Sequence, residues 1–145
     1  MTSYADTGFL VKLYLHEPES PEAGAIAANA SKPILLSPLT VLELKNALHL
    51  NVFQKRINES TRHAAWSSFE TDLASGLHAV MPIPGAEHYG RAAELADKYS
   101  ATEGSRSLDM LHVAAALFLQ ADELLSFDSR QRKVAVGEGL KVRPA

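Results

Sequence analysis

The sequence predicts an α/β domain built around a central, mainly parallel β-sheet. Short, continuously apolar segments alternate with longer ones whose apolar residues recur at three- and four-residue spacing, the pattern of strands connected by helices. The segment from Met110 to Leu119 has almost no polar face, so we expect a central helix buried on both sides. The 145 residues contain no internal repeat and no Gly/Ser-rich linker. Residues 1–145 are therefore expected to form a single domain.

The first half of the chain carries clear boundary signals for its elements. Pro18 and Pro21 interrupt the chain between two helical patterns. Ser37 followed by Pro38 is a favourable helix start, with serine as N-cap and proline in the first turn. The expected elements are a strand ending at Asp6, helices over 8–15 and 22–30, a strand over 34–36, and a helix from 38 to about 51.

The second half continues the alternation. Trp66, Phe69 and Leu73 stand three and four residues apart, as on one face of a helix. Gly137 and Gly139 end the last helical pattern. The expected elements are a helix over 59–75, a strand over 78–83, helices over 86–100 and 107–120, a strand over 123–127, a helix over 129–136, and an edge strand over 140–142.

The composition excludes several classes of site. The chain has no cysteine, which removes disulfide frameworks, thiolate zinc sites, iron–sulfur clusters and cysteine nucleophiles. No segment approaches the run of about 18 apolar residues that a membrane span needs. The N-terminus lacks the basic start of a signal peptide, so we expect a cytoplasmic protein without a membrane partner. The formal charge of −3 argues against a general nucleic-acid coat protein, although the C-terminal segment is locally basic.

Four acidic residues stand out by position: Asp6, Glu43, Asp109 and Asp128. Each has an ordinary explanation, because an acid near a helix N-terminus can cap the helix or stabilise its dipole. Asp6 and Asp128 nevertheless follow expected strands, Glu43 lies within two helical turns of another strand, and Asp109 opens the central helix. The carboxyl ends of parallel strands share one edge of a sheet, where open α/β sheets bind ligands. We therefore expect the four carboxylates to converge there.

A cation would stabilise such a cluster of carboxylates. Asp109 is the only charged side chain between Ser107 and Gln120, and a carboxylate on a buried apolar helix is costly unless it is paired or binds a cation. Four carboxylates in one pocket also repel one another, and an all-oxygen cluster suits Mg²⁺ or Mn²⁺. The sequence thus predicts a divalent-metal site, and such a site can activate water for phosphodiester cleavage.

Other motifs carry less weight. His112 stands three residues after Asp109 and could join a metal site, but we expect it to be a packed, hydrogen-bonded core histidine. The remaining histidines show no zinc-type spacing. The sequence contains neither a G-x-S-x-G nucleophile turn nor a G-x-x-x-x-G-K-[ST] phosphate-binding loop.

Four segments carry these acids in order: YADTGFLVKLY (4–14), LTVLEL (39–44), RSLDMLHVAAAL (106–117) and ADELLSFDSRQ (121–131). They resemble the motifs of PIN-domain ribonucleases, and more closely those of the VapC toxins of prokaryotic type II toxin–antitoxin pairs. The tail GLKV (139–142) is also similar. The resemblance spans nearly the whole chain. It implies a three-layer α/β/α fold with a central parallel sheet, and endoribonuclease activity that depends on Mg²⁺, with Mn²⁺ as a substitute.

The resemblance also implies roles for individual residues and partners. It implies an RNA substrate, a homodimer, and a cognate antitoxin that obstructs the site. Ser126 stands where the family commonly has threonine and keeps the hydroxyl. Arg106 matches a recurrent basic position, where phosphate binding and an internal ion pair are equal alternatives. By resemblance the catalytic and metal-binding acids are Asp6, Glu43, Asp109 and Asp128, the supporting hydroxyls are Thr7 and Ser126, and Arg106 is a candidate phosphate-binding residue. Arg130 is a second candidate because it adjoins Asp128 in the sequence.

Alternative functions remain open at this point. A non-catalytic module with the same fold could bind RNA or a protein partner, although the presence of all four acids disfavours it. A housekeeping RNA-processing nuclease could carry the same four acids as a toxin. A receiver domain or a phosphatase is remote, because the first expected strand does not end in paired acids or an Asp-x-Asp motif.

Overall fold

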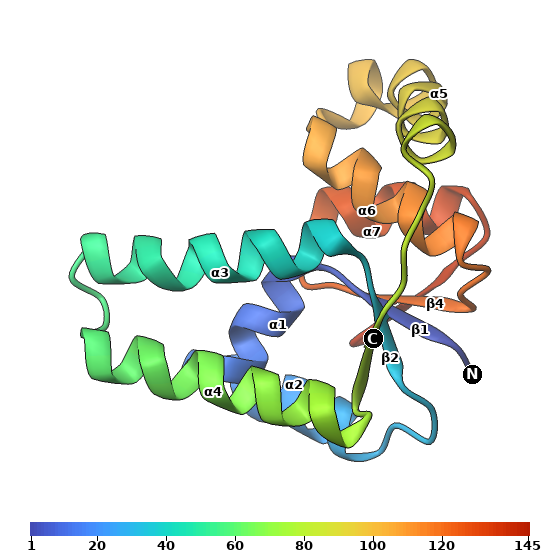
Figure 1. Cartoon of the computed structure of the whole chain (residues 1–145). Helices are drawn as coiled ribbons and strands as arrows, with labels where there is room; N and C mark the ends of the chain where they lie inside the picture. Colours follow the sequence, from blue (N-terminus) through green and yellow to red (C-terminus); the bar gives the residue numbers. More distant parts are fainter.

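The computed structural model describes all 145 residues and contains five short strands, with one or two helices between each strand and the next (Figure 1). The strands are β1 (Ser3–Ala5), β2 (Ile34–Leu36), β3 (His78–Val80), β4 (Glu123–Leu125) and β5 (Lys141–Arg143). The helices are α1 (Thr7–Tyr14), α2 (Ser20–Ala28), α3 (Pro38–Phe53), α4 (Glu59–Ser75), α5 (Gly85–Glu103), α6 (Ser107–Phe118) and α7 (Ser129–Gly137).

The strands form one sheet in the order β3-β2-β1-β4-β5, and every neighbouring pair is parallel. Tyr4 in β1 lies opposite Leu35 in β2 and Leu124 in β4. The chain extends the sheet outward from β1 on one side and then returns to extend it on the other. The order therefore reverses beside β1, and open α/β sheets bind ligands at such a switch point.

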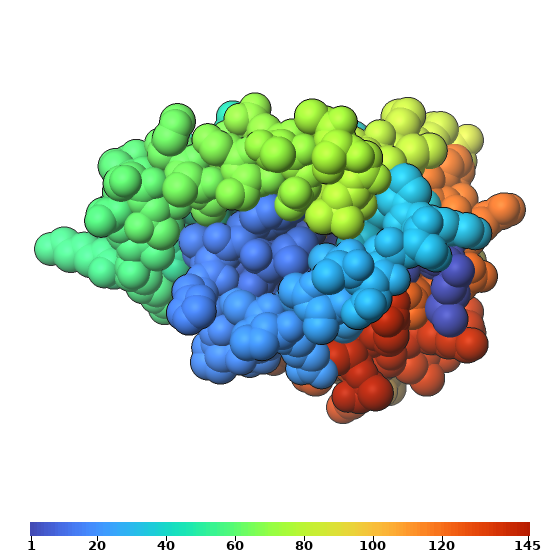
Figure 2. All heavy atoms as spheres, turned by 90° about the horizontal axis from the view of Figure 1, so that it is seen from below, coloured from blue at the N-terminus to red at the C-terminus, as the bar shows by residue number.

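Helices cover both faces of the sheet, as the predicted three-layer fold requires. Successive strand residues point to opposite faces, and the two hydrophobic clusters follow this alternation. Tyr4 and Leu124 pack with residues of α5, α6 and α7, whereas Ala5 and Leu125 pack with residues of α1 to α4. In Figure 1, α3 and α4 form a hairpin that projects from the sheet, away from α5 to α7. Figure 2 shows α1 and α2 between α4 and the C-terminal segment.

The central helix is buried as its sequence predicts. Every residue of α6 from Asp109 to Ala116 is buried. The helix packs against α5, α7 and β4, which leaves no face for water and explains why its sequence has almost no polar stripe. No helix combines the length and the apolar character that crossing a membrane requires.

The boundaries of several elements differ from those predicted. The second helix begins at Ser20 rather than residue 22, because Pro21 occupies the first turn, where its missing N–H costs nothing. The helix predicted to reach residue 120 ends at Phe118, and Gln120 adopts a left-handed φ of 56°. The strands predicted over 78–83 and 123–127 end at Val80 and Leu125, so the residues that follow are free to form the loops at the carboxyl edge of the sheet.

A partly buried hydrogen-bonded cluster joins α1, α4 and β3. The Tyr14 hydroxyl donates to Asp72 Oδ2 (2.5 Å) and lies 2.6 Å from His78 Nε2. Because the hydroxyl gives its one proton to Asp72, His78 must donate to it from a protonated Nε2. The ring nitrogen Nδ1 of His78 has no partner. Burial lowers the pKa of His78 from 6.5 to about 4, so His78 is neutral in the folded protein at neutral pH.

We expect acid to destabilise the fold through His78. Its folded pKa lies below its unfolded value, so the stabilisation is present above about pH 6.5 and is lost as the pH falls toward 4. A difference of this size corresponds to about 3 kcal/mol. Urea unfolding should show the free energy of unfolding falling more steeply with acidification in the wild type than in His78→Gln, which keeps an N–H donor for Tyr14 but does not titrate. Equal pH slopes in the two proteins would contradict this role.

Candidate active site

A cavity of about 320 Å³ opens at the carboxyl ends of β1 and β4 and contains all four predicted acids. The acids come from four parts of the chain: the loop after β1, helix α3, helix α6 and the loop after β4. The fold therefore brings the four carboxylates together in one cavity, as predicted. The residues that line the cavity are Asp6, Thr7, Gly8, Glu43, Arg106, Leu108, Asp109, His112, Asp128 and Gln131.

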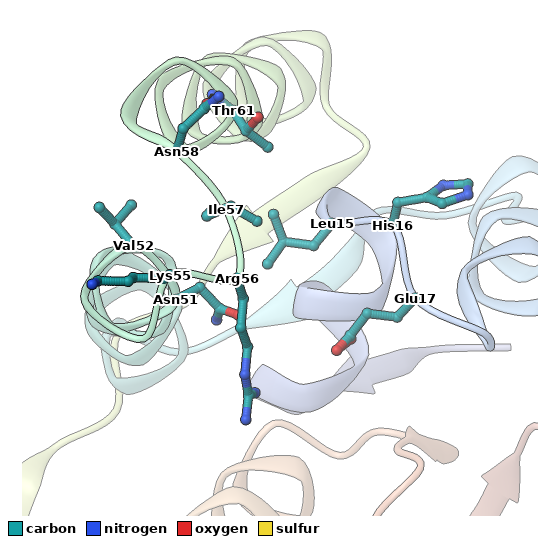
Figure 3. A pocket seen from close by; sticks show the side chains of 10 residues that line it. All are labelled: Leu15, His16, Glu17, Asn51, Val52, Lys55, Arg56, Ile57, Asn58 and Thr61. Carbon is teal, nitrogen blue, oxygen red and sulfur yellow. Dashed lines mark hydrogen bonds between the residues drawn. The ribbon is translucent and has the colours of Figure 1, made fainter.

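A larger cavity lies elsewhere (Figure 3). It has a volume of about 790 Å³ and lies between the end of α1 and the loop that joins α3 to α4. Its only carboxylate is Glu17, which pairs with Lys12 at 3.3 Å. This cavity lacks the grouped acids that metal-assisted chemistry needs, so we assign the candidate active site to the smaller, carboxylate-lined cavity.

Asp6 is held at the switch point by its own helix and by the neighbouring strand. It is the N-cap of α1, and its Oδ1 accepts a hydrogen bond from the Phe9 backbone N–H (2.8 Å). Its Oδ2 accepts from the Ser126 hydroxyl, which follows β4. The side chain is buried. Burial raises the pKa of Asp6 above its usual value, against the lowering effect of the Ser126 hydrogen bond. Capping and convergence are thus compatible roles for this carboxylate.

Asp109 and Asp128 face the same cavity from the starts of two helices. Asp109 Oδ2 accepts from the Arg106 backbone N–H (2.8 Å) in the first turn of α6. Asp128 is the N-cap of α7, and its Oδ1 accepts from the backbone N–H groups of Arg130 (2.9 Å) and Gln131 (3.1 Å). Asp109 is buried, whereas the Asp128 side chain is about one-third exposed, at 32%. Asp128 therefore forms the solvent side of the acid cluster.

Glu43 is fixed by groups that keep it ionised. Its Oε1 accepts from the Thr7 hydroxyl (2.9 Å) and lies 2.5 Å from His112 Nε2. Burial alone raises the pKa of Glu43, but the hydrogen bonds from His112 and Thr7 outweigh it and hold the pKa below the usual value. Because Thr7 and His112 both bind Oε1, the second oxygen of this carboxylate is left without a protein donor.

His112 lines the candidate site, although we expected it to be a core histidine. It is buried and hydrogen-bonded, as expected of a core histidine, but its partner at Nε2 is Glu43. At Nδ1 it lies 3.0 Å from the hydroxyl of Tyr4, whose pKa burial raises to about 12. The Tyr4 hydroxyl in turn contacts Ser37 at 2.9 Å. A continuous hydrogen-bonded chain therefore runs from the core to Glu43. Its only sequence signal is the three-residue spacing from Asp109.

The two predicted phosphate-binding arginines take different positions. Arg106 lies between two of the acids, with Nε 3.4 Å from Asp109 Oδ2 and Nη2 3.6 Å from Asp128 Oδ2. Of the two alternatives for this residue, the internal ion pair is the arrangement found. Its side chain is 66% exposed, so the pair is weak by itself. Arg130 contacts Asp128 through its backbone N–H, and the residue is exposed.

The donor set fits a hard divalent cation. Four carboxylates face one guanidinium in the cavity, and oxygen donors with excess negative charge are what Mg²⁺ and Mn²⁺ prefer. No three acidic or histidine side chains are arranged closely enough to hold an ion by themselves. Mg²⁺ keeps several waters and is usually bound through one or two carboxylates rather than a closed protein cage, so a magnesium site in this cavity would need water to complete it.

A comparison with protein families matches residues 3–137 to the PIN domain. The chain belongs to the PIN domain family. The match covers every element from β1 to α7 and includes all four acids. A comparison with curated protein sequences finds no significant match.

Solved structures share the fold of this PIN domain over nearly its whole length. FitAcB from Neisseria gonorrhoeae superposes with a TM-score of 0.66 and 17% identity, covering 97% of this chain and 96% of that one. VapC20 from Mycobacterium tuberculosis, described as a sarcin-ricin loop cleaving toxin, gives a TM-score of 0.72 and 17% identity over 99% and 100%. VapBC2 from Rickettsia felis, bound to a promoter DNA fragment, gives 0.67 and 14% over 99% and 98%. At these identities the likeness establishes a common fold.

Proposed function

We propose that this PIN domain is a Mg²⁺-dependent endoribonuclease, with Mn²⁺ able to substitute, and the toxin of a type II toxin–antitoxin pair. The observation that carries the proposal is the cavity in which Asp6, Glu43, Asp109 and Asp128 meet at the switch point of the sheet. Membership of the PIN family and the likeness to VapC20, described as a sarcin-ricin loop cleaving toxin, support it.

The side chains of the cavity suit hydrolysis of a phosphodiester bond. A bound divalent cation would activate water and stabilise charge on the leaving oxygen. Asp6, Asp109 and Asp128 would hold it together with bound waters. Glu43 is kept ionised by Thr7 and His112, and its free oxygen is suited to orient the attacking water and accept its proton.

Arg106 would have a second role when RNA binds. Its guanidinium is mostly exposed and pairs with acids that a cation would also bind. With Asp109 and Asp128 engaged in holding a cation, the same side chain would be free to bind an RNA phosphate through charge-assisted hydrogen bonds. Arg130, exposed at the start of α7, is the second candidate for a phosphate contact.

We also propose two kinds of partner for this chain, an antitoxin and a second copy of itself. VapBC2 and the toxin–antitoxin complex from Klebsiella pneumoniae share this fold, which supports an antitoxin as the partner of this chain. We propose a homodimer as the assembled form. An exposed apolar edge of α3, where Leu42, Leu50 and Phe53 are 65%, 45% and 82% exposed, is available for such an interface.

Cleavage of a mixed tRNA and rRNA pool tests the activity. We expect the purified protein to give discrete fragments with Mn²⁺ or Mg²⁺ and none with EDTA, because the carboxylates need a cation to act together. Asp6→Asn, purified in parallel, should give no fragments, which excludes a contaminating nuclease. Cleavage that persists in EDTA or in Asp6→Asn would refute the assignment. A lack of cleavage together with a lack of Mn²⁺ binding would favour a non-catalytic module that binds RNA or a protein.

A further inference from the structure

Gln131 links the two acids at the starts of α6 and α7. Its backbone N–H donates to Asp128 Oδ1 (3.1 Å), and its side-chain Nε2 donates to Asp109 Oδ1 (3.1 Å). The residue is 7% exposed and lines the carboxylate cavity. No other side chain in the protein donates a hydrogen bond to that oxygen of Asp109. Asp128 therefore holds the backbone of Gln131 in place, and the side chain of Gln131 holds Asp109 in place.

The opposite end of the Gln131 amide has no partner. Because the Nε2 group donates to Asp109 Oδ1, the carbonyl oxygen of the amide lies on the other side of the amide group. This Oε1 is buried and receives no hydrogen bond from the protein. Leaving a buried acceptor unpaired is unfavourable, and native proteins seldom do so without a ligand or water.

We propose that Gln131 is a fifth oxygen donor of the metal site, which holds Asp109 in place and offers its carbonyl oxygen to the hydrated cation. This inference rests on the proposed function. An amide carbonyl is a suitable neutral donor for Mg²⁺ or Mn²⁺. It adds an oxygen to the cavity without adding to the repulsion among the four carboxylates.

A purely structural role makes a different prediction. If Gln131 only ties α7 to α6, replacing it changes the stability of the fold and leaves cation binding unaltered. If it serves the metal site, replacing it changes the affinity for the cation. Partners that support a metal ligand typically change metal affinity about 10- to 100-fold when removed.

Mn²⁺ binding to the full-length protein separates these cases. Isothermal titration calorimetry and the Mn²⁺ electron paramagnetic resonance signal would be measured with Mn²⁺ alone, without RNA. Gln131→Met removes both the N–H donor and the oxygen while keeping the length of the side chain. Gln131→Glu keeps an oxygen at that position and removes the donor. Gln54→Met, at an exposed glutamine at the end of α3, is the matched control.

We expect Gln131→Met to weaken Mn²⁺ binding about 10- to 100-fold, Gln131→Glu to bind Mn²⁺ at least as tightly as the wild type, and Gln54→Met to match the wild type. Unchanged Mn²⁺ affinity in a folded Gln131→Met would overturn the inference. If Gln131→Glu binds as weakly as Gln131→Met, the oxygen is not a donor and the inference also fails. A wild type that binds no Mn²⁺ would instead refute the proposed function itself.

Discussion

Asp109→Asn is expected to reduce RNA cleavage by more than about 100-fold, the upper limit for residues that only support a metal ligand. The substitution removes a buried negative charge that would bind the cation directly. It should leave the fold intact, because asparagine can still accept the hydrogen bond from the Arg106 backbone N–H. Gln131 can also turn its amide over and present its unpaired carbonyl oxygen to the new NH₂ group.

The measurement is the initial rate of cleavage of the best RNA from the pool, with Mn²⁺ at saturation. Asp97→Asn, at an exposed acid on α5, is the matched control and should cleave at the wild-type rate. Circular dichroism and urea unfolding would establish that Asp109→Asn is folded. A folded Asp109→Asn that cleaves as fast as the wild type would remove this acid from the mechanism.

Arg143→Met is expected to lower the free energy of unfolding by about 3 kcal/mol, because it leaves a buried charge without its partner. Glu123 in β4 is 1% exposed and accepts from Arg143 Nη2 (2.6 Å) and Nε (2.8 Å) in β5, and from the Ser3 hydroxyl (2.6 Å) in β1. Burial raises the pKa of Glu123, but the bonds from Arg143 and Ser3 outweigh it and hold the pKa below its usual value. The pair therefore stabilises the fold above the unfolded pKa of glutamate and stops doing so as the pH falls through the folded pKa.

A double variant tests the reason for this loss. Glu123→Gln combined with Arg143→Met removes both charges, so urea unfolding should show much of the stability of the single variant restored. If the double variant is destabilised by the sum of the two single effects, the two side chains do not act as a pair, and the cost of Arg143→Met comes from lost packing.

The fold was largely predictable because local signals agreed with the tertiary structure. The helix start at Ser37 and Pro38, the break at Pro18, and the apolar run of α6 each correspond to an observed feature, whereas Pro21 lies inside the first turn of α2. Strand ends were less predictable. Apolar side chains continue to Ile83 after Val80, and Phe127 follows Leu125 by two residues, so the composition does not indicate where hydrogen bonding to the neighbouring strand stops.

The candidate site was predictable only in its acids. Asp6, Glu43, Asp109 and Asp128 could be found because a parallel sheet collects its loops at one edge. The roles of His112 and Gln131 depend on which side chains meet across elements far apart in the sequence. A histidine in an apolar helix and a glutamine in a polar one are each ordinary residues in isolation.

The central position of β1 governs when the site can exist during synthesis. Asp6 accepts a hydrogen bond from the hydroxyl of Ser126, which lies 120 residues later in the sequence. Strand β1 pairs with β2 and β4, so it has only one of its two neighbouring strands until β4 has been synthesised. A growing chain that has not reached residue 123 lacks half of the sheet contacts of β1 and the acid at residue 128. Such a chain contains three of the four carboxylates but not the cavity that joins them. Any activity of this cavity therefore requires a chain that extends through residue 128, and fragments that end earlier lack it.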